Sequence, residues 1–341
     1  AMIIFPQALS VTLPYKDANE CIIQGAGKRA YKTLAFQASV PKSSRVVKTY
    51  DMYYESAMTP TPWGELTWPF PSLQDLMRGI RYGEVIYIGS GVKMGKTELQ
   101  IDLAAHFIKN HDIKVLLCSP EAIGDELWKK SLNKMVGTVF DDPKVEFDIE
   151  EYKRASKMAQ EYVYHVDLYQ NIEWENLRQD IVYAASIGCR AVFIDPITNL
   201  TNGMSASEAN TVLSGVSQEL ALLAKNLNIS IFVFCHLKAH DGNVSKDVRN
   251  SKYRQHKYFN LGNCPHELGG DILSSQFAGS RAMMRSCHLM LGLAGNKDPE
   301  LPDHIQNRRW LCINEDRRFG NSAHIPILRD PHTTMYSEVQ E

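Results

Sequence analysis

The sequence of 341 residues lacks the features that mark membrane, secreted or repeat proteins. Its longest apolar runs, such as residues 229–235, are far shorter than the roughly 20 residues that cross a bilayer, which argues against a membrane-spanning chain. Residues 1–10 show no basic region followed by a small-residue cleavage site, so we expect no secretory signal. No internal repeat or low-complexity tract is visible. Because these features are absent, we expect an ordinary folded protein.

Cysteine pairs with metal-binding or redox spacing are also missing. The seven cysteines are scattered and odd in number, with no CxxC pair, which is typical of a reducing, intracellular compartment. One group could still offer imidazole and thiolate ligands to zinc. It consists of His236, His240, His256, Cys264 and His266. Its spacing matches no common zinc pattern, so we expect ordinary loop histidines there.

A large excess of one charge is absent as well. The 37 Lys and Arg nearly balance the 39 Asp and Glu, which gives a formal net charge of −2. This balance argues against a coating basic surface, so any contact with nucleic acid must be a local patch.

The chain changes character near residue 80. Seven prolines punctuate the first 80 residues, so we expect a linker or docking arm there, with a helix near residues 46–57. From residue 82 short β-rich apolar runs alternate with helical stretches, which predicts an α/β fold with a mostly parallel sheet flanked by helices. We expect strands over residues 85–89, 114–119, 163–168, 190–194, 229–235, 288–293, 310–313 and 324–328. We expect helices over residues 96–110, 121–136, 174–186 and 208–226.

The strongest motif is an eight-residue loop that follows an expected strand and opens an expected helix. It consists of Ser90, Gly91, Val92, Lys93, Met94, Gly95, Lys96 and Thr97. Backbone N–H groups of such a loop point at nucleotide phosphates, Lys96 would neutralise the β- and γ-phosphate oxygens, and Thr97 would ligate Mg²⁺. A plain glycine turn would not explain Gly-Lys-Thr at a helix start. The loop therefore predicts a site for ATP, or another NTP or dNTP, with Mg²⁺.

Two acids follow later strands. Glu121 comes after residues 114–119, where a general base could orient water toward the γ-phosphate; alternatively it is a first-turn glutamate of the next helix. Asp195 ends the apolar strand 190–194, where such enzymes hold Mg²⁺; alternatively it caps a turn. The order loop, glutamate, aspartate favours the catalytic interpretation.

Basic side chains gather in two places. Residues 238–257 carry six Lys or Arg against two acids, which suits contact with a nucleic-acid backbone or, alternatively, a solvated excursion. The candidates for DNA contact are Lys238, Lys246, Arg249, Lys252 and Arg254. Near the C-terminus, Arg317 and Arg318 are either surface charges or a finger that reaches the γ-phosphate of a neighbouring subunit.

Taken together, these motifs resemble the RecA-type helicase domain of short-tailed bacteriophage primase-helicases, with Twinkle and the DnaB replicative helicases as more distant relatives. The resemblance covers most of residues 65–335. It rests on residues 83–86, 90–97, Glu121, 194–195, 235–238, 279–280 and 317–320. Residues 13–21 are similar to the end of the primase polymerase domain. The resemblance thus implies a primase (TOPRIM) remnant over 1–25, a linker and docking arm over 26–80, and a RecA-like ATPase domain over 81–341.

The resemblance also implies roles for the candidate residues. The family forms rings, usually of six subunits, with ATP between subunits and single-stranded DNA in the channel. By this likeness Lys96 and Thr97 bind nucleotide and Mg²⁺, Glu121 activates water, and Asp195 supports the metal. His236 would sense the γ-phosphate, and Arg317 or Arg318 would be the finger acting in trans. A helix at residues 45–57 would dock on the adjacent subunit, a replisome polymerase is a possible partner, and the site of action would be the cytoplasm of an infected bacterial host.

One departure from the family concerns the finger. A lysine usually lies two positions before it, whereas here Glu315 or Asp316 takes that place, and an acid would repel the γ-phosphate. The resemblance as a whole implies an ATP-driven replicative DNA helicase that moves 5′ to 3′. The departure leaves two alternatives open. One is a nucleotide-gated DNA-binding ring or loader with weak ATPase activity. The other is a RecA-like recombinase or packaging ATPase, against which residues 13–21 argue.

Overall fold

The computed structural model describes residues 11–37, 49–140, 142, 144–167, 172–238, 265–277 and 280–339. The chain divides into two compact units, Ala1–Pro62 and Trp63–Glu341. Each unit is described by itself.

The first unit contains three helices among its described residues: α1 (Ala18–Ile23), α2 (Gly27–Phe36) and α3 (Thr49–Met58). The Asp17 side chain begins α1 by accepting a 2.8 Å hydrogen bond from the Glu20 N–H. Cys21 and Ala30 are buried in this unit. The sequence predicted a helix near α3, whereas α1 and α2 were not predicted.

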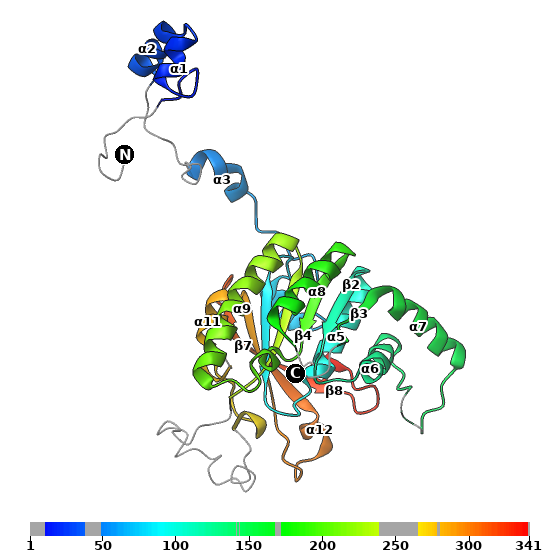
Figure 1. Ribbon diagram of the computed structural model, residues 1–341. Helices are drawn as coiled ribbons and strands as arrows, with labels where there is room; N and C mark the ends of the chain where they lie inside the picture. The colour runs from blue at the N-terminus through cyan, green and yellow to red at the C-terminus, as the bar shows by residue number, and fades with distance from the viewer. Residues whose placement is uncertain are drawn as a thin grey trace, which may run out of the picture. The chain divides into compact units, whose positions relative to one another are not determined.

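The second unit is built on a nine-stranded sheet with the strand order β3-β2-β4-β5-β1-β6-β7-β8-β9 (Figure 1). The strands are β1 (Val85–Ser90), β2 (Lys114–Cys118), β3 (Val163–His165), β4 (Cys189–Ile194), β5 (Ser230–His236), β6 (Leu289–Gly295), β7 (Arg308–Asp316), β8 (His324–Arg329) and β9 (Tyr336–Glu338). The first six in the spatial order are parallel, and β7, β8 and β9 continue the sheet as antiparallel strands. Because β1 is the fifth of the nine strands, between β5 and β6, the loop that follows it opens at the centre of the whole sheet.

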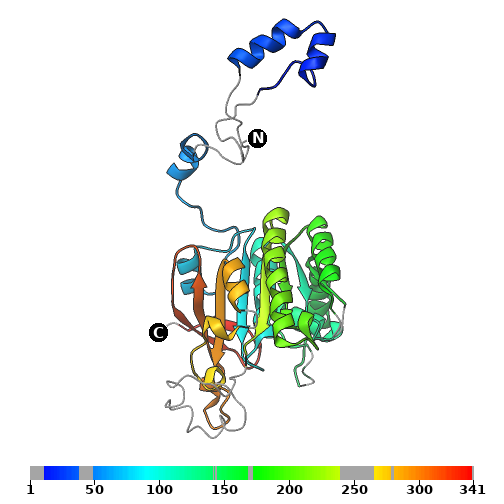
Figure 2. The ribbon, with the colours of Figure 1, turned by 60° about the vertical axis from the view of Figure 1, so that its left-hand side comes forward.

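Helices cover both faces of this sheet. On one face α5 (Lys96–His111), α6 (Gly124–Val136) and α7 (Ile149–Tyr162) pack against side chains such as Ile86 and Ile88 of β1. On the other face α8 (Trp174–Ser186), α9 (Ala206–Leu227) and α11 (Ser280–Ser286) pack against the alternate side chains, Val85 and Tyr87. Figure 2 shows α8 and α9, in green, side by side across their face. Strands buried on both faces form continuous apolar runs in the sequence, which is the pattern of β1, β5 and β6 here.

Residues 63–80 belong to the second unit. Helix α4 (Pro71–Met77) has its proline in the first turn, where a missing N–H costs no hydrogen bond. Leu66 pairs with Ile80 in an antiparallel bridge, and Trp68, Phe70 and Leu73 are buried in the core. The compact unit thus starts at Trp63, before the boundary at residue 81 that the sequence indicated. Proline punctuation alone misses this, because a proline at a helix start is compatible with the fold.

The predicted α/β class with a mostly parallel sheet is confirmed, and every expected strand lies where the sequence placed it to within a few residues. Helix α6 begins at Gly124 and not at residue 121, so the prediction was wrong about the helix start. Strand β9 and the helices α4, α7, α11 and α12 (Asp303–Gln306) were not predicted. A helix suited to spanning a bilayer does not occur among the described residues.

Candidate nucleotide site

The loop after β1 has the backbone of an anion-binding turn. Gly95 precedes α5 with a φ of 97°, and Lys93 has a φ of 59°. A side chain at position 95 would also collide with the Tyr336 hydroxyl. Glycine is therefore required at position 95 by conformation and by space. The loop places its N–H groups at the N-terminus of α5, where the helix dipole favours negative charge.

Three strand ends bring the predicted polar side chains to this loop. His236 ends β5 as the register partner of Ser90, and Asp195 follows β4, with its N–H donating to the Cys118 carbonyl of β2 at 2.8 Å. Glu121 follows β2 in a turn outside α6, whose first-turn acids are Asp125 and Glu126. The alternative of a first-turn helix glutamate does not apply to Glu121.

Lys96 and His236 are in direct contact. The Lys96 Nζ lies 2.8 Å from His236 Nδ1, and because an ammonium group only donates, Nδ1 is the acceptor. The imidazole proton then sits on Nε2, which lies 3.6 Å from Glu121 Oε1. Burial and the neighbouring Lys96 lower the pKa of His236, which keeps the ring neutral. Burial also lowers the pKa of Lys96, and Asp195 opposes that effect.

Thr97 and Asp195 form a second polar pair. The Thr97 hydroxyl donates to Asp195 Oδ2 at 2.7 Å, and the Asp195 side chain is buried. Burial raises the pKa of Asp195, while Lys96 and Thr97 lower it. A buried carboxylate beside a hydroxyl fits Mg²⁺, which takes one or two carboxylates and completes its shell with substrate phosphates and water. Within the described residues no group of three or more His, Cys, Asp and Glu could hold a metal alone.

These side chains line one cavity of about 430 Å³. The lining includes Glu121, Asp195, His236, the loop from Val92 to Thr97 and Glu98 of α5. Three further lining residues come from the C-terminal strands and were not identified from the sequence. They are Arg309, Arg329 and Tyr336. All three come from β7, β8 and β9, and no local motif marks them, because their position depends on how the antiparallel strands register.

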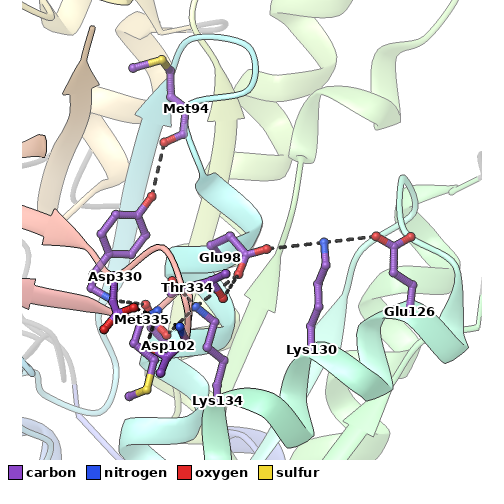
Figure 3. A network of polar contacts seen from close by, with 11 residues as sticks. Met94, Glu98, Asp102, Glu126, Lys130, Lys134, Asp330, Thr334 and Met335 are labelled. Carbon is purple, nitrogen blue, oxygen red and sulfur yellow. Dashed lines mark hydrogen bonds and ion pairs between the residues drawn. The ribbon is translucent and has the colours of Figure 1, made fainter. Parts of the chain in front are cut away.

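The C-terminal strands also hold α5 and the loop in place (Figure 3). The backbone N–H of Tyr336 donates to Asp102 Oδ2 at 2.9 Å, and its hydroxyl lies 3.5 Å from the Met94 carbonyl. Lys134 of α6 is fully buried, with its Nζ 3.1 Å from Glu98 and 3.0 Å from Asp102. The strands beyond the parallel sheet thus support the helix that carries Lys96 and Thr97.

Arg317 and Arg318 lie away from this cavity. They follow β7, whose end pairs with the start of β6, so they lie at the sheet edge opposite the phosphate loop. Arg318 forms a 2.6 Å ion pair with Glu84, and Arg317 donates to the Arg285 carbonyl at 3.3 Å. Neither side chain can reach the nucleotide loop of its own chain.

The two acids before these arginines have local partners. Asp316 accepts hydrogen bonds from the backbone N–H groups of Arg318, Phe319 and Asn321 at 3.0, 3.2 and 3.0 Å. Glu315 accepts a 2.7 Å hydrogen bond from the Ser274 hydroxyl. Asp316 therefore shapes the turn that presents the arginines.

The remaining predicted residues fall in two groups. Ser90 is buried at the end of β1, and Lys238 is exposed just after β5, with its N–H donating to the Gln276 carbonyl at 2.7 Å. The other predicted DNA contacts and most of the weighed zinc ligands lie outside the described residues. They are Lys246, Arg249, Lys252, Arg254, His240, His256 and Cys264.

Comparisons with known proteins identify relatives of this chain. The chain is 24% identical over 311 residues to the DNA helicase/primase of Enterobacteria phage T3, a match that covers 88% of this chain and 51% of that protein. The chain therefore spans about half the length of this curated relative. One solved ATPase domain matches with a TM-score of 0.62 at 14% identity, over 88% of this chain and 100% of that one.

A DnaB-like replicative helicase, solved in a study of its interactions with primase, matches with a TM-score of 0.65 at 14% identity, over 95% of this chain and 75% of that one. These structures share the fold of this chain. Residues 66–251, more than half of the chain, match the family described as DnaB-like helicase C terminal domain. The chain belongs to the DnaB-like helicase C-terminal domain family.

Proposed function

We propose that this chain is the motor of a replicative DNA helicase that hydrolyses ATP, or a related NTP or dNTP, while moving 5′ to 3′ along single-stranded DNA. The observation that carries the proposal is the convergence of Lys96, Thr97, Glu121, Asp195 and His236 on one cavity above the phosphate loop. Membership of the DnaB-like family supports the same activity.

Within the cavity each side chain has a distinct task. Backbone N–H groups of the loop and the Lys96 ammonium bind the phosphates, and Glu121, whose side chain is 53% exposed, orients a water and accepts its proton at Oε1. Thr97 and Asp195 would hold Mg²⁺. When bound, the ion neutralises charge on the phosphate oxygens.

The contact between Lys96 and His236 couples nucleotide to the rest of the chain. A γ-phosphate competes for the Lys96 ammonium, so its arrival releases His236 Nδ1 and its loss restores the 2.8 Å contact. His236 lies two residues before Lys238, where the basic stretch begins. A change at this contact would therefore reach Lys238 first, and the other proposed DNA-binding residues, Lys246, Arg249, Lys252 and Arg254, follow it in the basic stretch.

A ring of subunits would complete the site. Arg317 and Arg318 lie at the edge opposite the loop, so either can act only on nucleotide bound by a neighbouring copy. Arg318 is engaged with Glu84, so we favour Arg317 as the finger and Arg318 as its support. In the same arrangement, residues 1–25 would be the end of a primase domain. The linker expected over residues 26–80 would lie before Trp63, where the second compact unit begins, and its helix α3 would dock on the adjacent subunit.

The test is steady-state ATP hydrolysis with and without single-stranded oligo-dT. A motor shows turnover that DNA stimulates strongly. A DNA-binding ring or loader shows slow turnover that DNA leaves unchanged, and a recombinase pairs homologous strands without unwinding a forked duplex.

A further inference from the structure

A buried carboxylate is bound to the phosphate loop from outside the cavity. Glu267 is 5% exposed, and its Oε1 accepts a 2.9 Å hydrogen bond from the Val92 N–H. Its Oε2 lies 2.9 Å from Lys297 Nζ, and Lys297 also donates to the Val92 carbonyl at 3.4 Å. Both polar groups of the Val92 backbone are thus held by one ion pair.

The fit around this ion pair is close. A methyl group at Gly91 would lie 2.6 Å from Glu267 Cγ and 3.0 Å from His266 Cδ2, so the loop and the Glu267 side chain cannot move independently. The backbone on either side is joined as well, because the Lys297 N–H donates to the Glu267 carbonyl at 3.0 Å and Leu268 pairs with Asn296. The ion pair is therefore fixed to the end of β6.

Glu267 differs from the loop's other neighbours in the group that it binds. Arg309 and Tyr336 contact a loop carbonyl, at Met94, whereas Glu267 accepts from an N–H in a loop whose N–H groups receive phosphate. An anion beside a phosphate site is unfavourable unless a cation neutralises it, and Lys297 supplies that cation. We therefore expect Glu267 to make a favourable contribution to the loop that offsets the electrostatic cost of its charge.

We infer that Glu267 is a positioning residue that fixes the Val92 end of the phosphate loop in its phosphate-binding conformation, and that Lys297 keeps the carboxylate in place. Glu267 is not among the described residues that line the cavity, so its effect on nucleotide passes through the loop. It acts on binding: without it the loop samples conformations that do not accept phosphate, and bound nucleotide must select the correct one.

The experiment measures kcat and KM for Mg·ATP in the full chain carrying Glu267→Ala, Glu267→Gln or Lys297→Met. Glu267→Ala is expected to raise KM about tenfold while kcat changes by less than about twofold, because ground-state and transition-state binding weaken equally. Glu267→Gln keeps an acceptor for the Val92 N–H and should give an intermediate KM. Glu161→Ala, on the exposed surface of α7, is the matched control and should leave both constants unchanged.

The inference rests on the proposed nucleotide site, and the two can fail separately. If the unmodified chain does not hydrolyse or bind ATP, the proposed function fails. If it does, and Glu267→Ala and Lys297→Met both keep the original KM, the positioning role is refuted. A merely structural role would lower the melting temperature and the active fraction but leave KM unchanged. Should Glu267→Ala not fold, Lys297→Met decides the question, with a raised KM expected.

Discussion

Acids at the ends of strands differ here in what surrounds them. Asp195 is buried against Thr97, Glu121 is half exposed on the cavity wall, and Asp316 is occupied by backbone N–H groups of its own turn. The first can hold a cation, the second can reach water, and the third is structural. The sequence suggested that an acid beside the arginines would repel the γ-phosphate. Asp316 is instead engaged by the backbone N–H groups of its own turn.

Lys238 provides a test at this scale. Replacing Lys238 with Ala removes one exposed cation beside the nucleotide site, so affinity for single-stranded DNA should fall. The negative slope of log affinity against log salt concentration should become shallower by about 0.7, the value for one phosphate contact on a single strand. Fluorescence anisotropy with labelled oligo-dT over a salt series measures both.

The control for this variant is Lys153→Ala, which removes an exposed cation on α7. Its affinity and salt slope should match those of the unmodified chain. If Lys238→Ala behaves like the control, Lys238 does not contact DNA.

Sequence reasoning identified the cavity residues whose position follows from local order: a loop between a strand and a helix, and polar residues just after apolar strands. It could not identify Arg309, Arg329 or Tyr336, because antiparallel pairing across β7, β8 and β9 brings them to the cavity. Glu267 was missed because its partners Val92 and Lys297 are distant from it in sequence.

Among the elements, α5 has the central place because it carries Lys96 and Thr97 and is held from two sides. At the C-terminal end of α5, Thr67 lies between two histidines. The Thr67 hydroxyl is 3.0 Å from His106 Nε2 and 2.8 Å from His111 Nε2. The Thr67 N–H also donates to His111 Nε2 at 3.0 Å, and Asn110 Nδ2 lies 3.0 Å from His106 Nδ1. These bonds fix both rings as neutral.

This cluster predicts a loss of stability in acid. Burial lowers the pKa of His106 to about 4, against an ordinary value of 6.5, and burial lowers the pKa of His111 as well. The unfolded chain therefore binds more protons than the folded chain between these values, so the cluster destabilises the fold as pH falls from 6.5 toward 4. Melting temperatures across this range should fall more for the unmodified chain than for His106→Gln.

The melting temperature of the unmodified chain must be compared with that of His106→Gln, because Asp102 changes the stability with pH in the opposite direction. Burial raises its pKa to about 6, so the folded chain gains a proton there and stability rises as pH falls below that value. Since Asp102 is present in both chains, its effect cancels. Parallel melting curves for the two chains would contradict the assignment of neutral histidines.

The other side of α5 is held by Lys134. Replacing Lys134 with Met leaves the buried Asp102 without a cation and Glu98 with Lys130 alone, which should lower the free energy of unfolding by about 3 kcal/mol. Lys130→Met removes a lysine that is 29% exposed and pairs with Glu98 and Glu126, and should cost less than about 1 kcal/mol. Urea denaturation measures both, and equal losses would show that burial of Lys134 is not what matters.

Among the elements, the sequence predicted the parallel strands and the helices α5, α6, α8 and α9, because strands buried on both faces form apolar runs, but it missed the connecting helices α7 and α11. It placed the start of α6 too early, since Glu121 favours a helix start by composition but lies in a turn. It missed β9, whose three residues carry no periodic signal, and α4, whose proline suggested a break.

For the whole molecule, the opposite placement of loop and arginines predicts that the active unit is a pair of copies. Lys96→Ala and the double variant Arg317→Ala/Arg318→Ala should each be inactive alone. Mixed in equal amounts and allowed to assemble, about a quarter of the interfaces would combine an intact Lys96 with intact arginines. DNA-stimulated ATP hydrolysis should then reappear in the mixture. Co-assembly without any recovered turnover would contradict action in trans.

If ATP is cleaved in the cavity that Glu121 lines, Glu121→Gln should separate the binding of ATP from its hydrolysis. The amide keeps the size of the side chain but accepts a proton poorly, so ATP should bind as it does to the unmodified chain. Turnover with oligo-dT should fall by at least about a hundredfold, the contribution typical of a general base. Turnover equal to that of the unmodified chain, with ATP bound equally well, would contradict the account.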